Sequence, residues 1–193
     1  MLYPTGAPRP TEIVPVTIPN IITLFRLLLV PTIVWAIVEG YFGAAFIVFV
    51  VAGVSDGIDG FIARRYNLRS RLGAYLDPLA DKALLVSIFL SLTFLSEIPL
   101  WLAMLVVSRD LLIIGGVLLA WVLDRPIEVR PLFISKVNTT AQIIFAALVL
   151  GDLAFSAGLL GVREVLVVIV GVLTVASAAA YLMDWARHMA SQD

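Results

Sequence analysis

The chain contains no cysteine and only one histidine, His188, among its 193 residues. Disulfide bonds, thiol catalysis and cysteine-ligated metals are therefore excluded, and any histidine-based site would rest on that single residue. Charged residues are also scarce, at 14% of the chain against about a quarter in soluble domains. Hydrophobic residues make up 61%, which indicates a membrane protein. The net charge of -1 gives no sign of a nucleic-acid partner.

Six apolar segments are long enough to cross a bilayer core, which needs about 20 mostly apolar residues per helix. Some of them qualify only if interrupting charges are allowed. The segments cover residues 18–38, 41–64, 76–95, 98–123, 132–150 and 165–187. The connections are short, and no internal repeat or second domain is evident. We therefore expect an all-α polytopic membrane protein with six transmembrane helices, formed by residues 18–193.

Residues 1–17 are expected to form a cytosolic N-terminal tail. The first 19 residues hold five of the ten prolines, and repeated proline blocks helix formation. No basic region is followed by an apolar core, which argues against a signal peptide, and a single arginine argues against a transit peptide. We therefore expect the protein in a bacterial inner membrane.

Lysine and arginine predict the orientation of the six segments. One side would hold nearly all of the basic residues that lie between the segments or near their ends: Arg9, Arg64, Arg65, Arg69, Arg71, Arg125, Arg130, Lys136 and Arg187. The other side would hold only Arg163. Because basic loops stay in the cytoplasm, both termini are expected to be cytoplasmic.

Four carboxylates lie close together where the second and third segments meet, at Asp56, Asp59, Asp77 and Asp81. At about 100° per residue, the first two differ by roughly 60° around their helix and the last two by roughly 40° around theirs. Each pair therefore points in one direction. Because a short basic turn makes the two helices antiparallel neighbours, we expect all four carboxylates to converge.

Converging carboxylates repel one another unless cations lie between them. Ligands that are all oxygens suit Mg²⁺ or Mn²⁺, and two such ions form a known centre for phosphoryl chemistry. The small residues Gly60 and Ala63 would leave room for a nucleotide, and Arg64 could donate a forked pair of hydrogen bonds to a phosphate.

Two other interpretations of the four acids were weighed. They could pair with the arginines of the same turn, at residues 64, 65, 69 and 71, or they could belong to a proton or cation pathway. A pathway would place polar groups across the full bilayer depth, whereas the interiors of the last two segments are nearly free of charge. Acids arranged as two converging pairs therefore favour a metal-dependent enzyme over a transporter.

The stretch of residues 56–81 resembles the CDP-alcohol phosphotransferase family, whose pattern is D-x2-D-G-x2-A-R-x8-G-x3-D-x3-D. Every fixed position is matched, by Asp56, Asp59, Gly60, Ala63, Arg64, Gly73, Asp77 and Asp81. The resemblance implies a six-helix membrane fold, a homodimer and a site open to the cytoplasmic leaflet.

The resemblance also implies roles for individual residues. Asp56, Asp59 and Asp77 would bind one divalent ion, and Asp56, Asp59 and Asp81 a second. Asp81 would also act as the catalytic base that takes the proton of the acceptor hydroxyl. The CDP group would be contacted by residues Asp56, Gly60, Ala63, Arg64 and Gly73.

Within the family, residues 108–113 (SRDLLI) and 131–142 (PLFISKVNTTAQ) resemble the CMP-forming cardiolipin synthases. Those enzymes join CDP-diacylglycerol to phosphatidylglycerol. The alternative is a phosphatidylglycerophosphate synthase, which uses glycerol 3-phosphate and typically carries a further arginine soon after the SRE motif. Here an uncharged run, residues 111–120, follows Asp110, which favours the lipid acceptor.

Further polar residues fall inside or at the ends of apolar segments. Arg109, Arg130 and Lys136 are candidates for contacts to the acceptor phosphate; Arg109 could instead form an ion pair, and Lys136 could simply be solvated. Asn20, Thr23 and Arg26 recur every three residues, which fits helix packing or substrate contact. Lys82 would offset the acidic cluster.

Single cysteines can test the predicted topology, because the chain has none of its own. Cysteines introduced near Arg69 and Arg125 should react with a membrane-impermeant maleimide from the cytoplasmic side only. A cysteine near Gly161 should react only from the opposite side. The reverse labelling pattern would overturn the orientation drawn from lysine and arginine.

Overall fold

A computed structural model describes residues 18–66, 71–122 and 132–190, without the side chains of 18–22, 59–66, 71–78, 117–122 and 187–190. All of the regular structure in these ranges is helical, as predicted. The helices are α1 (Ile18–Val38), α2 (Phe42–Tyr66), α3 (Arg71–Phe94), α4 (Leu100–Val122), α5 (Phe133–Phe155) and α6 (Leu160–Ala190). The number and order of the helices confirm the sequence prediction, although α3 and α6 each begin five residues earlier than expected and α5 ends five residues later. The expected tail, residues 1–17, lies outside the described residues.

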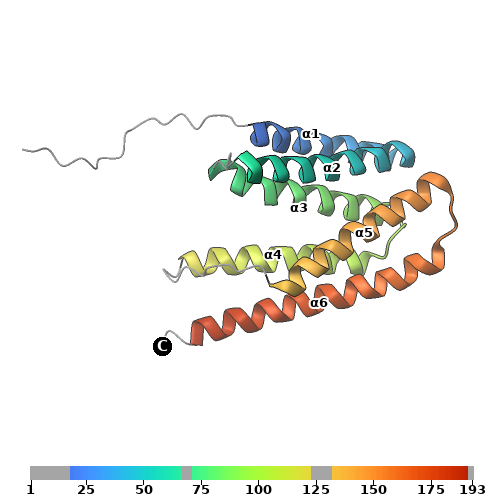
Figure 1. The fold of residues 1–193 in the computed structure, drawn as a ribbon. Coiled ribbons are helices and arrows are strands. Elements are labelled where there is room, and N and C mark those ends of the chain that lie inside the picture. The colour runs from blue at the N-terminus through green and yellow to red at the C-terminus, as the bar shows by residue number, and fades with distance from the viewer. Residues whose placement is uncertain (1–17, 67–70, 123–131, 191–193) are drawn as a thin grey trace, which may run out of the picture.

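The helices run up and down in one bundle (Figure 1). Helix α1 packs against both α2 and α3, whereas α6 packs against α4 and α5. Helix α5 crosses obliquely between these two groups and also contacts α2. Since the helices alternate in direction, α1 begins and α6 ends at the same end of the bundle, here called the site end. The opposite end, with connections 39–41, 95–99 and 156–159, is called the turn end.

The connections at the turn end share one way of ending a helix. Gly40, with φ of +77°, follows α1, and the Tyr41 N–H then donates to the Ala36 carbonyl at 2.8 Å. After α3, Ser96 has φ of +63° and the Glu97 N–H donates to the Leu92 carbonyl at 2.9 Å. This left-handed cap satisfies carbonyls that the helix leaves without partners and reverses the chain within a few residues.

Arg163 near the start of α6 holds the turn end together. Its guanidinium donates to the Glu97 carboxylate at 2.8 Å and to that of Asp152 at 3.3 Å. Asp152 also accepts a 2.9 Å hydrogen bond from the Leu159 N–H. Since Arg163 is buried, these contacts connect α6 to α5 and to the turn that follows α3. The only basic residue predicted on this side is therefore engaged within the protein.

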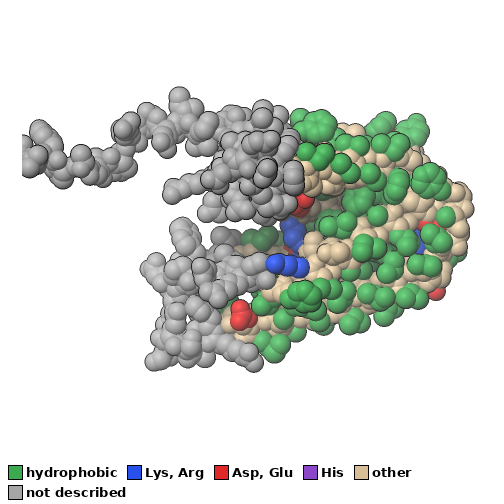
Figure 2. Space-filling view, viewed as in Figure 1, with side chains coloured by type: hydrophobic (Ala, Val, Ile, Leu, Met, Phe, Trp, Pro, Cys, Tyr) green, Lys and Arg blue, Asp and Glu red, His purple; other side chains and the backbone are tan. Residues whose placement is uncertain are grey.

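The bundle is apolar outside as well as inside. Large hydrophobic side chains are exposed on every helix, with Leu28, Ile47, Phe94, Leu111, Phe133 and Val172 each more than 60% exposed. Figure 2 shows hydrophobic side chains over most of the described surface on one face, with Lys, Arg, Asp and Glu in a hollow and at the ends. Several polar side chains are instead buried, including Arg26, Arg109, Asn138 and Gln142. This inverted polarity is expected of a protein whose surface faces lipid.

Within the described residues, two helical stretches are long and apolar enough by themselves to cross a membrane, α5 and residues Leu160–Ala186 of α6. Shorter apolar stretches lie in α1 (Thr23–Val38) and α2 (Phe42–Ile58). Charged residues interrupt the apolar runs of α1, α2, α3 and α4, at Arg26, Asp56, Asp81 and Arg109 among others. The six helices are thus established, whereas six membrane crossings remain a prediction.

Gly171 allows α6 to approach α4 closely. A Cβ at this position would lie 2.9 Å from Cζ3 of the Trp101 ring. Gly171→Leu should therefore overpack this contact and lower the free energy of unfolding by roughly 1–3 kcal/mol, measured by denaturation in micelles. Gly161→Leu is the control, because nothing lies within 4 Å of its added Cβ. Equal stabilities of the two variants would contradict the close contact.

Candidate active site

Two of the four predicted metal ligands are brought together across α2 and α3. Asp56 and Asp81 both form ion pairs with the guanidinium of Arg26 on α1; Nη2 lies 2.8 Å from Asp56 Oδ1, and Nη1 contacts Asp81 Oδ1. The Arg26 side chain is 1% exposed, whereas each carboxylate is 46% exposed. The guanidinium is therefore buried beneath the two carboxylates, which lie between it and the surface.

The remaining residues of the predicted pattern fall outside the described side chains. Asp59, Gly60, Ala63 and Arg64 belong to α2, and Gly73 and Asp77 belong to α3, but only the backbone of these positions is described. Arg130 lies outside the described residues altogether. Metal and CDP contacts at these positions therefore stay predictions.

The described carboxylates fit a hard divalent cation by their chemistry. Asp56 and Asp81 come from separate helices and converge on the Arg26 guanidinium. Their side chains offer only oxygen atoms as metal ligands, which such a cation prefers. No cluster of three potential metal ligands among His, Cys, Asp and Glu occurs within the described part of the chain. That result does not bear on Asp59 and Asp77, whose side chains are not described. The convergence expected for Asp56 and Asp81 is confirmed, with Arg26 as the partner that lies between them.

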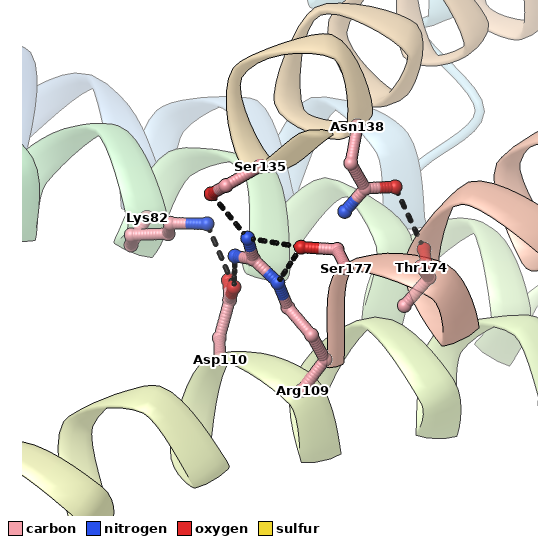
Figure 3. A network of polar contacts seen from close by, with 7 residues as sticks. All are labelled: Lys82, Arg109, Asp110, Ser135, Asn138, Thr174 and Ser177. Atoms are coloured by element: carbon pink, nitrogen blue, oxygen red, sulfur yellow. Dashed lines mark hydrogen bonds and ion pairs between the residues drawn. The ribbon is translucent and has the colours of Figure 1, made fainter. Parts of the chain in front are cut away.

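Arg109 lies at the centre of a buried polar network (Figure 3). Its Nη1 donates to Asp110 Oδ1 at 2.6 Å, and Nη2 donates to the hydroxyls of Ser135 and, at 2.8 Å, of Ser177. Its guanidinium also lies 5.6 Å from the centre of the Tyr181 ring, within range of a cation–π interaction. Protein groups already accept hydrogen bonds from most of the N–H groups of Arg109. The contact with Asp110 confirms the interpretation of Arg109 as part of an ion pair. Contact with an acceptor phosphate stays a prediction.

Lys82 joins the same network from α3. Its Nζ donates to Asp110 Oδ1 at 2.7 Å, so one carboxylate oxygen serves both Lys82 and Arg109 (Figure 3). Lys82 follows Asp81 directly, which places this network next to the candidate metal site. The Lys82 side chain is 30% exposed, so it forms the accessible edge of the network. Lys136, near the start of α5, is exposed.

Two residues, Arg26 and Lys82, form contacts that the sequence pattern does not predict. Arg26 was expected either to pack helices or to contact substrate, yet it joins two predicted metal ligands. A usable signal existed, since Arg26 is the only charged residue of α1 and ionisable groups in membrane helices are costly. Lys82 was expected only to offset the acids, and no spacing rule could have related it to Asp110, 28 positions away.

Residues 16–184 match the CDP-alcohol phosphatidyltransferase family, and the chain belongs to this family. Enzymes of the family generally depend on divalent metals. The chain is also similar to individual characterised proteins. A human protein named cardiolipin synthase (CMP-forming) is 40% identical over 149 residues, which cover 69% of this chain and 50% of that protein.

Of two further relatives, one carries the same name as the human protein and one a different name. A Streptomyces coelicolor protein named cardiolipin synthase (CMP-forming) is 39% identical over 60% of this chain and 61% of its own length. A rice chloroplast protein named CDP-diacylglycerol–glycerol-3-phosphate 3-phosphatidyltransferase 1 is 36% identical over 67% of this chain and 45% of its own. The chain thus spans about half the length of the human and rice relatives.

Asp110 should be the residue on which this network depends. Asp110→Asn keeps the shape but leaves the buried Arg109 and its neighbour Lys82 without a negative charge. Breaking one partner of a buried pair typically costs about 3–5 kcal/mol, so the free energy of unfolding in micelles should fall by that order.

Asp184→Asn provides the matched control, because Asp184 is an exposed acid on α6. Its stability should stay within about 0.5 kcal/mol of the original chain. If the two variants unfolded alike, Asp110 would not hold α3 to α4.

Proposed function

We propose that this protein transfers a phosphatidyl group from CDP-diacylglycerol to a glycerol-type acceptor and releases CMP. The observation that carries the proposal is the meeting of two half-exposed carboxylates, those of Asp56 and Asp81 from two helices, at one buried guanidinium. Both belong to a pattern that the family shares, and the family match covers residues 16–184. The names of the human and Streptomyces relatives support phosphatidylglycerol as the acceptor and cardiolipin as the product.

The reaction needs one base and one leaving group. The acceptor hydroxyl oxygen attacks the phosphorus that carries the diacylglycerol, and the bond from that phosphorus to the bridging oxygen of CMP breaks. The hydroxyl proton passes to a carboxylate of the site, for which Asp81 is the candidate. CMP leaves with the bridging oxygen, so atoms and charge balance without another reactant.

The charges of the described site support bound divalent ions. The carboxylates of Asp56, Asp81 and Asp110 are matched by three cations, those of Arg26, Lys82 and Arg109. The group of Arg26, Asp56 and Asp81, taken by itself, has one net negative charge and therefore offers no positive charge for a pyrophosphate. Mg²⁺ or Mn²⁺ held by Asp56, Asp59, Asp77 and Asp81 would supply that charge and would stabilise the leaving phosphate.

The same balance favours an acceptor with a single negative charge. Asp110 neutralises one of its two cationic neighbours, which leaves the Lys82–Asp110–Arg109 group with one net positive charge. Phosphatidylglycerol is a monoanion with two acyl chains, whereas glycerol 3-phosphate is a small dianion that calls for several fixed cations. Lys136 and Arg130 would assist at the rim. Glycerol 3-phosphate remains the alternative, and the name of the rice relative supports it.

The apolar surface supports a place inside a membrane. We propose that all six helices cross a bacterial inner membrane, with both termini and the site on the cytoplasmic side. The exposed hydrophobic side chains on every helix fit lipid contact, and pairing of the buried charges lowers the cost of crossing. The family resemblance supports assembly as a homodimer.

An assay of CMP release tests the proposed function. Purified protein in mixed micelles with CDP-diacylglycerol and Mg²⁺ should release CMP at least tenfold faster with phosphatidylglycerol than with glycerol 3-phosphate. Mass spectrometry should then find cardiolipin. Phosphatidylglycerophosphate as the sole product would favour the alternative acceptor, and the absence of CMP with either acceptor would refute the transferase and reopen a transport function.

Two controls belong to this assay. EDTA should abolish CMP release, and added Mg²⁺ or Mn²⁺ should restore it, because the proposed ligands are all oxygens. Asp81→Asn keeps the size of the side chain but cannot accept the proton, so turnover should fall by roughly 10²–10⁴. Turnover near that of the original chain would exclude Asp81 as the base.

A further inference from the structure

We infer that Arg26 is a positioning residue of the metal centre, which holds the Asp56 and Asp81 carboxylates in place before and after a divalent cation binds. This inference rests on the proposed function, because it assumes that these carboxylates are metal ligands. It assigns to α1 a part in the site that lies outside the aspartate pattern of α2 and α3.

The geometry supports a fixed rather than a displaceable guanidinium. Arg26 is 1% exposed and uses separate nitrogens, Nη2 for Asp56 and Nη1 for Asp81. Two contacts through one planar group fix the carboxylates relative to each other in both distance and orientation. Helix α1 packs against both α2 and α3, so the arginine is anchored on a helix that contacts the helices of both its partners.

The two carboxylates face the buried guanidinium on one side and the solvent-accessible surface on the other. Asp56 and Asp81 are each 46% exposed although their common partner is buried, so both can meet a ligand from the surface while the guanidinium stays behind them. A carboxylate can accept several hydrogen bonds or metal bonds through its two oxygens. Groups that hold metal ligands from behind in this way typically contribute 10–100-fold to metal affinity.

A competing role for Arg26 predicts the opposite change in metal affinity when the residue is removed. If the guanidinium occupied the place of the metal and had to leave when the ion binds, its removal would strengthen metal binding. If it positions the ligands, its removal weakens metal binding, because two unpaired carboxylates repel one another and turn apart. The change in metal affinity upon removal of Arg26 therefore decides between the two.

The test is Mn²⁺ binding to purified protein without substrate, measured by the electron paramagnetic resonance signal of free Mn²⁺. Arg26→Gln should weaken binding about 10–100-fold relative to the original chain. Arg26→Lys keeps the charge but loses the fork, so it should weaken binding to a smaller extent. If Arg26→Gln fails to fold, Arg26→Lys alone decides, by the sign of its change in affinity.

Arg163→Gln is the matched control. Arg163 is also a buried arginine that binds two carboxylates, those of Glu97 and Asp152, but at the turn end. Both glutamine variants should lose thermal stability, whereas only Arg26→Gln should lose Mn²⁺ affinity. Unchanged or tighter Mn²⁺ binding in the Arg26 variants would overturn the inference. Absence of Mn²⁺ binding to the original chain would instead refute the metal centre of the proposed function.

Discussion

A guanidinium buried in an apolar bundle has to be paired, and pairings of this kind connect the helices here. Arg26, Arg109 and Arg163 are each at most 8% exposed, and each contacts at least one carboxylate. The contacts connect α1 to α2 and α3, α4 to α5 and α6, and α6 to α5. In lipid the hydrophobic effect does not drive helices together, so polar contacts and close packing have to specify their arrangement.

These ion pairs differ between the turn end and the site end in how far solvent can reach them. At the turn end, Arg163 and its two acids form a group in which Asp152 and Arg163 are buried. At the site end, the carboxylates bound by Arg26 and the amine of Lys82 remain partly exposed. The same kind of ion pair is therefore mostly shielded from solvent at the turn end and partly open to solvent at the site end, where the proposed catalytic carboxylates lie.

The sequence predicted the helices well, because they depend on local composition. Apolar runs of about 20 residues located all six helices, and the short connection between α2 and α3 predicted that Asp56 and Asp81 lie at the same end of the bundle. The spacing of Asp56 with Asp59 and of Asp77 with Asp81 stays a prediction, because the side chains of residues 59 and 77 are not described. Spacing relates residues within one helix, however, and says nothing about a third helix. The guanidinium of Arg26, 55 positions before Asp81, could therefore not be identified as the shared partner.

The network around Arg109 shows the same limit. The sequence offered two partners for Arg109, an adjacent acid and an acceptor phosphate, and only the packing of α5 and α6 supplied Ser135 and Ser177. The contact of Lys82 with Asp110 depends on how α3 rises beside α4, which no local pattern specifies. Metal contacts of Asp59 and Asp77 rest on the pattern alone, because their side chains are not described.

The engagement of Arg163 has a consequence for an energised membrane. Among the described residues, four acids, Glu39, Glu97, Asp152 and Glu164, lie at the turn end with this one arginine. The turn end of the described chain thus carries a net negative charge, and under the proposed topology this charge lies on the side of the membrane opposite the cytoplasm. A membrane potential that is negative inside acts on such a charge distribution with about 2.3 kcal/mol per elementary charge per 100 mV. Under the proposed topology, such a potential would favour insertion with the acidic turn end outside, whereas vesicles without a potential would lack this contribution.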